Sequence, residues 1–226
     1  MAKWYFSPSS QQANISHGYN EELWNNALCD TIMIIMQRHG EECKRNNPKN
    51  TYAMHTIESN TWGSDFHVPL HSNAIVSDAM TGQTRRSGPT VGCSNPLIPT
   101  AKGTILSNLI YEELYKLWQP EVKRPIADYT FWEVEKTNMP CAYVEGFYHD
   151  NPNDQKFAIE RREDIAIAIC IGCLAMVGKV YDGAERVRPL YRIQAGYNWR
   201  NKTYAEIYLR KMEEAGFVGK IIETIE

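Results

Sequence analysis

Apolar residues occur along the chain in two patterns, as short continuous runs and as positions at helical spacing. The continuous runs predict strands at residues 4–6, 41–45, 65–74, 89–93, 130–134 and 141–147. Helical spacing predicts helices at residues 21–39, 51–60, 103–118 and 154–177. Strands that alternate with helices are typical of a largely parallel sheet covered on both faces. We therefore predict a three-layer α/β sandwich over residues 1–178, with a mostly parallel central sheet flanked by helices.

The first predicted helix has clear signals at both ends. Asn20 is a favourable N-cap, and Glu21 and Glu22 put acidic side chains in the first turn, where the helix dipole stabilises them. Gly40 suits the position just beyond the last turn. Because this helix follows the first strand, we expect its first turn to lie at the carboxyl edge of the sheet.

The C-terminal part of the chain has a pattern of its own. Residues 179–189 carry several charges and predict a linker. After it, a strand at 190–195, a helix at 202–215 and a strand at 217–222 predict a small βαβ unit over residues 190–226. Such a unit buries little core alone. We expect it to dock on the first domain or to pair with the tail of a second copy, forming a homodimer.

Composition and charge exclude several classes of protein. The net charge of -3 argues against a nucleic-acid partner held by bulk electrostatics. No apolar run approaches the ~18 residues of a membrane span, and residues 1–6 are too short and polar for a signal peptide. We expect synthesis in the cytoplasm and no membrane partner. The six cysteines are scattered, and Cys170 and Cys173 fall within a helical pattern that predicts core packing.

Two histidines lie on one strand at residues 65–74. His67 and His71 point to the same face, since a strand alternates with period two, but they are roughly 13 Å apart along it. One ion cannot take both unless the strand bends. His71, where the strand ends, is the better candidate ligand. The alternative is that both are hydrogen-bonded core histidines.

Two acidic residues are expected near His71. Glu145 follows a run of apolar strand residues, which places its carboxylate at the carboxyl edge of the sheet, where ligands bind in open α/β folds. Glu22, in the first helical turn, would face the same edge. A histidine, a ligating glutamate and a second carboxylate that accepts a proton from water make a plausible catalytic zinc site. The alternative for Glu145 is a salt-bridged structural acid.

The same residues carry a resemblance to a known family. Glu22 with Asn26, residues 65–74 and residues 140–154 resemble, in order and spacing, the zinc-dependent N-acetylmuramoyl-L-alanine amidases of bacterial cell walls and phage endolysins. The resemblance covers roughly residues 3–178. It implies a peptidoglycan substrate, a Zn²⁺ cofactor, Glu22 and His71 as zinc ligands, and Glu145 as the catalytic carboxylate.

One position departs from the family pattern. The family supplies a first zinc histidine after the opening strand, whereas this chain has Ser10 there, in a Ser-Pro-Ser-x-Gln type turn that resembles a phage-type branch. A serine hydroxyl is a poor zinc ligand compared with imidazole. We expect His149, four residues after Glu145, to be the third ligand, with His17 and His67 as the alternatives.

The tail resembles half of a SPOR-type peptidoglycan-binding module, carried by residues 191–197 and by the Ala-Gly-Phe turn at 215–217. This resemblance implies glycan binding, and the alternative is a packing extension. The expected absence of a signal peptide fits a phage endolysin, which reaches the host wall after its release. The alternatives for the whole chain are an inactive wall-binding protein of the same fold and another zinc peptidase or deacetylase.

Overall fold

The computed structural model describes residues 1–16, 19–74, 87–92, 101–119 and 131–183. The chain divides into two compact units, Met1–Ala184 and Glu185–Glu226. The predicted tail at 190–226 and His17 both lie outside the described residues. Among the described residues, no helix is long and apolar enough to cross a membrane.

A five-stranded sheet forms the centre of the first unit, in the order β4-β1-β5-β7-β6. Its strands are β1 (Lys3–Pro8), β4 (Glu42–Arg45), β5 (Phe66–Asn73), β6 (Thr90–Gly92) and β7 (Tyr143–Tyr148). Every neighbouring pair is parallel except β6 and β7, which are antiparallel. The predicted mostly parallel sheet is confirmed.

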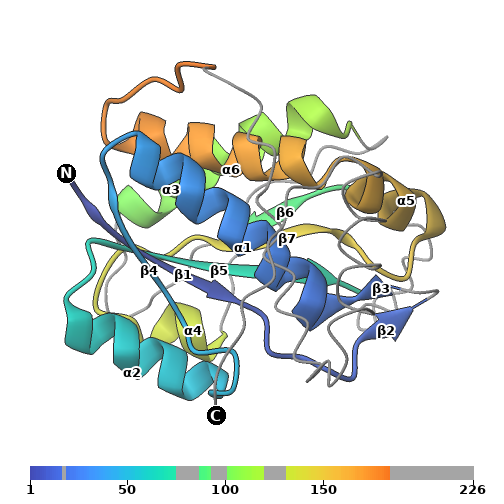
Figure 1. The fold of residues 1–226 in the computed structure, drawn as a ribbon, viewed down its shortest axis with the longest axis horizontal. Helices are drawn as coiled ribbons and strands as arrows, with labels where there is room; N and C mark the ends of the chain where they lie inside the picture. The colour runs from blue at the N-terminus through green and yellow to red at the C-terminus, as the bar shows by residue number, and fades with distance from the viewer. Residues whose placement is uncertain (17–18, 75–86, 93–100, 120–130, 184–226) are drawn as a thin grey trace, which may run out of the picture. The chain divides into compact units, whose positions relative to one another are not determined.

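Helices cover both faces of this sheet (Figure 1). One layer holds α1 (Glu21–Arg38), α3 (Ala101–Leu117) and α6 (Arg162–Met176), and the other holds α2 (Tyr52–Trp62) and α4 (Trp132–Glu135). The short α5 (Pro152–Glu160) follows β7, and a small antiparallel pair, β2 (Ile15–Ser16) and β3 (Tyr19–Asn20), precedes α1. The three-layer α/β fold is as predicted.

The central strands are buried on both faces, which explains their continuous apolar runs. Trp4, Tyr5 and Phe6 of β1 are fully buried, and Trp4 stacks on Phe66 of β5 with ring centroids 4.3 Å apart. The start of α1 is also as predicted, because the Asn20 side chain accepts a hydrogen bond from the backbone N–H of Leu23 at 2.9 Å. The Asn20 cap therefore fixes the residue at which α1 begins.

Two predicted elements were wrong. Where a strand was predicted at 130–134, the described residues from 131 on form the N-cap and most of the helix α4, a single turn too short to show a helical period in the sequence. The predicted helix at 154–177 is two helices, since Asn151 caps α5 with Pro152 in its first turn, and the non-helical backbone at Arg161, with φ −121° and ψ 25°, separates α5 from α6. Cys170 and Cys173 are fully buried in α6, as predicted for core residues.

The contact between α3 and α6 depends on a glycine. A Cβ atom at Gly172 would lie 2.7 Å from both the Cα and the backbone nitrogen of Ile110. We expect Gly172→Ala to lower the free energy of unfolding by about 1–3 kcal/mol, since the overlap with backbone outweighs alanine's helix propensity. Urea unfolding measures this, with Gly146→Ala as the control because no atom lies within 4 Å of that added Cβ. An equal loss in both variants would contradict the packing explanation.

Candidate active site

A cavity of about 580 Å³ opens at the carboxyl edge of the sheet. It is bordered by the segment after β1, the ends of β5 and β7, and residues of α2 and α4. Ser10, His71, Glu145 and His149 all line it. The structure therefore brings together at one edge three of the four predicted site residues, His71, Glu145 and His149, along with Ser10.

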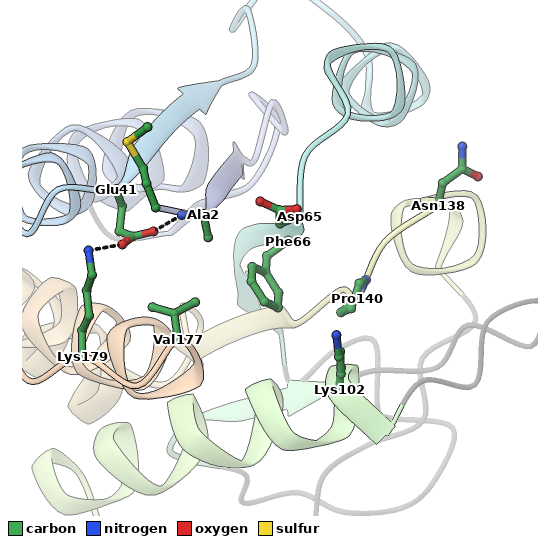
Figure 2. A pocket seen from close by; sticks show the side chains of 10 residues that line it. Ala2, Glu41, Asp65, Phe66, Lys102, Asn138, Pro140, Val177 and Lys179 are labelled. Atoms are coloured by element: carbon green, nitrogen blue, oxygen red, sulfur yellow. Dashed lines mark hydrogen bonds and ion pairs between the residues drawn. The ribbon is translucent and has the colours of Figure 1, made fainter.

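A second cavity, of about 640 Å³, lies near the opposite, amino edge of the strands (Figure 2). Its buried acid is Glu41, which accepts hydrogen bonds from the backbone N–H of Ala2 at 2.7 Å and from Trp4 Nε1 at 3.1 Å. Lys179 also forms an ion pair with Glu41. Because this carboxylate already ties β1 to the segment after α6, we assign it a structural role.

Glu41 makes the stability of the protein sensitive to acid. Burial alone would raise its pKa, but the hydrogen bonds from Lys179, Ala2 and Trp4 lower the pKa below the ordinary value of 4.5. A lowered pKa stabilises the fold above pH 4.5, and this contribution is lost as the pH falls through the folded-state pKa. We expect Glu41→Gln to cost about 2 kcal/mol at neutral pH. In chemical unfolding, the difference from wild type should shrink below pH 4.5, and a difference independent of pH would contradict the assignment.

His71 and Glu145 occupy directly opposite positions on β5 and β7. Both side chains are mostly buried, with 7% and 8% of their surface exposed. Asn73 Nδ2 donates a hydrogen bond to Glu145 Oε2 at 2.5 Å. Thus the register of the two parallel strands places an imidazole beside a carboxylate whose orientation is fixed by an amide.

The carboxylate nearest to His71 comes from α1. Glu21 Oε1 lies 3.0 Å from His71 Nδ1, and Glu21 Oε2 accepts a hydrogen bond from Asn14 Nδ2 at 2.6 Å. Glu21 is fully buried. Burial alone would raise the pKa of Glu21, but its hydrogen bonds with His71, Asn14 and Ser9 lower it. The first turn of α1 therefore supplies an ionised carboxylate to the cavity.

The structure places Glu21, rather than the predicted Glu22, in this cluster. Successive residues on an α-helix are turned by about 100°, so only one of the two can face the sheet edge. Glu22 is partly exposed and pairs with the Gln12 side chain, 3.4 Å from Gln12 Nε2. We therefore transfer the role expected of Glu22 to Glu21.

His149 also lies beside Glu21. Its Nδ1 is 4.0 Å from Glu21 Oε2 and 2.9 Å from the hydroxyl of Ser72, and its ring stacks on Tyr19 with centroids 5.7 Å apart. By contrast, His67 is fully buried one strand length away, where Nδ1 is 2.9 Å from Ser59 Oγ. Of the three candidate histidines, His149 is in the cavity, His67 packs in the core, and His17 lies outside the described residues.

Glu133 is a buried acid that the sequence analysis missed. Its Oε1 accepts a hydrogen bond from Ser7 Oγ at 2.5 Å and lies 3.4 Å from His67 Nε2 and 3.8 Å from His55 Nδ1. Its Oε2 is 3.8 Å from His71 Nε2. Burial would raise the pKa of Glu133, but the three histidines hold it well below its ordinary value.

His71 thus lies between two carboxylates, one at each ring nitrogen. Burial alone would lower the pKa of His71, but Glu133 and Glu21 raise it to about 9. A pKa raised in this direction favours a proton on both ring nitrogens at neutral pH when no metal is bound. The sequence pattern did not point to Glu133 or His55. Each of their helices contributes a single acidic or imidazole side chain to the site, so no repeated spacing marks either residue.

Solved structures with the same fold are known, although neither a protein-family model nor a curated protein sequence matches the chain. The CwlD amidase from Clostridioides difficile, in complex with the GerS lipoprotein, aligns with a TM-score of 0.65 at 16% identity, covering 79% of this chain and 99% of that one. The N-acetylmuramyl-L-alanine amidase Ami1 from Mycobacterium smegmatis gives 0.65 at 14% identity, covering 78% and 97%. The catalytic domain of the CD27L endolysin targeting Clostridia difficile gives 0.62 at 17%, covering 80% and 99%. The chain has the fold of these proteins.

The donor atoms of the site match zinc in kind and partly in spacing. One carboxylate and two imidazoles form a known ligand set of zinc hydrolases. Ligand atoms around a tetrahedral zinc ion are about 3.3 Å apart, and Glu21 Oε1 and His71 Nδ1 are 3.0 Å apart. His149 Nδ1 is farther, at 4.0 Å from Glu21 Oε2, and no group of three such side chains in the described part of the chain is already arranged to hold a metal. The donors fit zinc if the His149 ring moves toward Glu21.

Proposed function

We propose that the chain hydrolyses peptidoglycan at the amide between the lactyl group of N-acetylmuramic acid and the L-alanine of the stem peptide. The observation that carries this proposal is the pairing of His71 with Glu145 across β5 and β7, with Glu21 against the same histidine. The fold that holds these residues is also that of N-acetylmuramoyl-L-alanine amidases.

Glu21, His71 and His149 are the residues that would hold a zinc ion. A bound zinc ion supplies Lewis-acid polarisation of the scissile carbonyl and a lowered pKa for the attacking water. Because the ligands must be deprotonated, uptake of the ion requires His71 to release the proton that Glu21 and Glu133 favour. Zinc affinity should therefore rise with pH up to about 9, the pKa of His71.

Glu145 is the residue that moves protons. Its carboxylate accepts the proton of the attacking water and then delivers it to the leaving amine of L-alanine. Asn73 holds the Glu145 carboxylate in place through the hydrogen bond to Oε2. Glu133 helps to orient the His71 ring, because its carboxylate faces the second ring nitrogen of His71.

Product analysis on purified peptidoglycan tests this proposal. Hydrolysis of the lactyl amide should release free L-alanine amino termini without new reducing sugars. New reducing ends would indicate cleavage of the glycan, and new amino termini on other residues would indicate a peptidase. Release of acetate would indicate a deacetylase. Any of these three products in place of L-alanine termini overturns the proposed reaction.

One observation favours a second candidate, a wall-binding protein that has lost catalysis. Where the amidase family has its first zinc histidine, this chain has Ser10 in the lining of the cavity. The purified protein distinguishes the two. Zinc bound at one ion per chain, with amide hydrolysis, supports the enzyme, whereas wall binding without zinc or hydrolysis supports the second candidate.

We also propose that the protein acts on the bacterial wall after release from the cell that makes it, as a phage endolysin. The Ser-Pro-Ser-x-Gln turn, which resembles a phage-type branch of the amidase family, motivates this proposal. Residues 190–226 would then add affinity for glycan or join two chains. Sedimentation of the chain with insoluble wall material, with and without residues 184–226, tests the role of the tail.

A further inference from the structure

Three large aromatic side chains line the outer part of the active-site cavity. They are Tyr52 at the start of α2, and Phe131 and Trp132 at the start of α4. Their exposed fractions are 56%, 42% and 48%. Leaving so much aromatic surface in water makes no contribution to folding, and exposed apolar surface beside a cavity marks a binding site.

The rings contact one another in two sets, one of which reaches the reaction centre. Tyr52 and Trp132 meet edge to face with centroids 6.5 Å apart. Phe131, next to Trp132 in the chain, lies against Tyr143 at 4.8 Å, and Tyr143 stacks on His71 at 4.7 Å. Ring contacts therefore connect Phe131 to the imidazole of the proposed metal site, and Tyr52 and Trp132 form a second ring pair in the same cavity lining.

Amide side chains line the same cavity on its other elements. Gln11 and Asn14 follow β1, and Asn73 ends β5. Asn14 Nδ2 donates to Gln11 Oε1 at 2.7 Å, which orients this pair. A sugar ring presents C–H groups on its faces and hydroxyl and acetamido groups around its edge. Flat aromatic faces together with amide donors and acceptors are complementary to both.

We propose that Tyr52, Phe131 and Trp132 form a saccharide-binding platform that stacks on pyranose rings of an N-acetylated glycan strand. The choice of ligand rests on the proposed function. The scissile amide is attached to a sugar ring through a lactyl group alone, so a sugar must lie within a few ångströms of His71 and Glu145 during hydrolysis. Phe131 is connected to His71 through the ring of Tyr143, and Tyr52 and Trp132 line the same cavity, which suits a chain of linked sugars.

The test uses the full chain and a soluble probe, the β-1,4-linked tetramer of N-acetylglucosamine. Saturation-transfer NMR detects contact with the sugar rings, and calorimetry gives the dissociation constant. We expect Trp132→Ala and Tyr52→Ala each to weaken binding by about fivefold, as for the loss of one ring contact. Trp132→Phe should retain binding. The matched control is Ile57→Ala, an exposed apolar residue of α2 (54% exposed) outside the cavity lining.

Each outcome bears on one claim. If the wild-type chain does not bind the tetramer, or if Trp132→Ala binds it as tightly as wild type with an unchanged melting temperature, the platform is wrong. If a sugar-free stem peptide binds through Trp132 while the tetramer does not, the platform is a peptide site and the inference also fails. Binding through Trp132 in a chain that never releases L-alanine termini overturns the proposed reaction and leaves the platform standing.

Discussion

Replacing Glu145 by Gln is expected to slow release of L-alanine termini from peptidoglycan by about 10²–10⁴-fold, the usual contribution of a general acid–base. Glutamine has nearly the same shape and can still contact Asn73, but it cannot accept the proton of the attacking water. Glu145 lies at the register position opposite His71, so its loss removes the carboxylate to which the proposal assigns proton transfer. Zinc content should be unchanged, because Glu145 is not among the proposed ligands.

The measurement is the rate of amine release, followed alongside zinc content and thermal unfolding. Glu160→Gln is the matched control, since Glu160 is an exposed acid on α5 whose side chain is 60% accessible. The control should hydrolyse peptidoglycan as wild type does. A Glu145→Gln chain that cleaves at the wild-type rate would show that Glu145 is not the proton-transfer group and would leave the proposed mechanism without one.

The fold could be predicted because local patterns and burial agree along most of the chain. The apolar run at Trp4–Phe6 predicted a strand buried on both faces, and the structure buries all three residues fully. Parallel strands end at a common edge, so placing His71 and Glu145 at the ends of their strands was enough to predict that they meet. The register that places them directly opposite each other on β5 and β7 is seen only in the structure, and the prediction did not depend on it.

The part of the site that lies on helices was harder to predict. Capping by Asn20 fixes where α1 begins but not how the helix is rotated on the sheet. That rotation is set by the buried stripe through Asn25, Leu28 and Ile32, and Glu21 lies on the same stripe, at four-, three- and four-residue steps. The sequence contains this spacing, but the prediction did not follow the stripe back to Glu21 in the first turn.

Glu133 could not be found by pattern at all. It lies on a four-residue helix, where neither a strand nor a helix period can be distinguished, and its partners come from three other elements. His55 reaches it from α2, which packs against α4, and His67 reaches it from β5. Local sequence carries no record of such a tertiary contact.

The rotation of α1 leads to the second large expected effect. Glu21→Gln should lower zinc affinity by more than about 100-fold, the upper end for groups that only support a ligand, and amide hydrolysis should fall with it. The change removes the negative charge that faces His71 Nδ1 at 3.0 Å while leaving the shape of the side chain almost intact. Zinc bound per chain, measured by elemental analysis after dialysis, gives the direct readout, and the hydrolysis rate gives the second.

Glu22→Gln is the matched control, because it changes the same residue type one position along the same helical turn. Glu22 faces Gln12 at 3.4 Å instead of His71, so this variant should keep wild-type zinc content and hydrolysis. If Glu22→Gln lost zinc and Glu21→Gln kept it, the assignment made from the sequence would be correct and the one made from the structure wrong. If both variants bound zinc as wild type does, the metal would be held elsewhere, and the cluster of Glu21, His71 and His149 would be a hydrogen-bonded network without a catalytic ion.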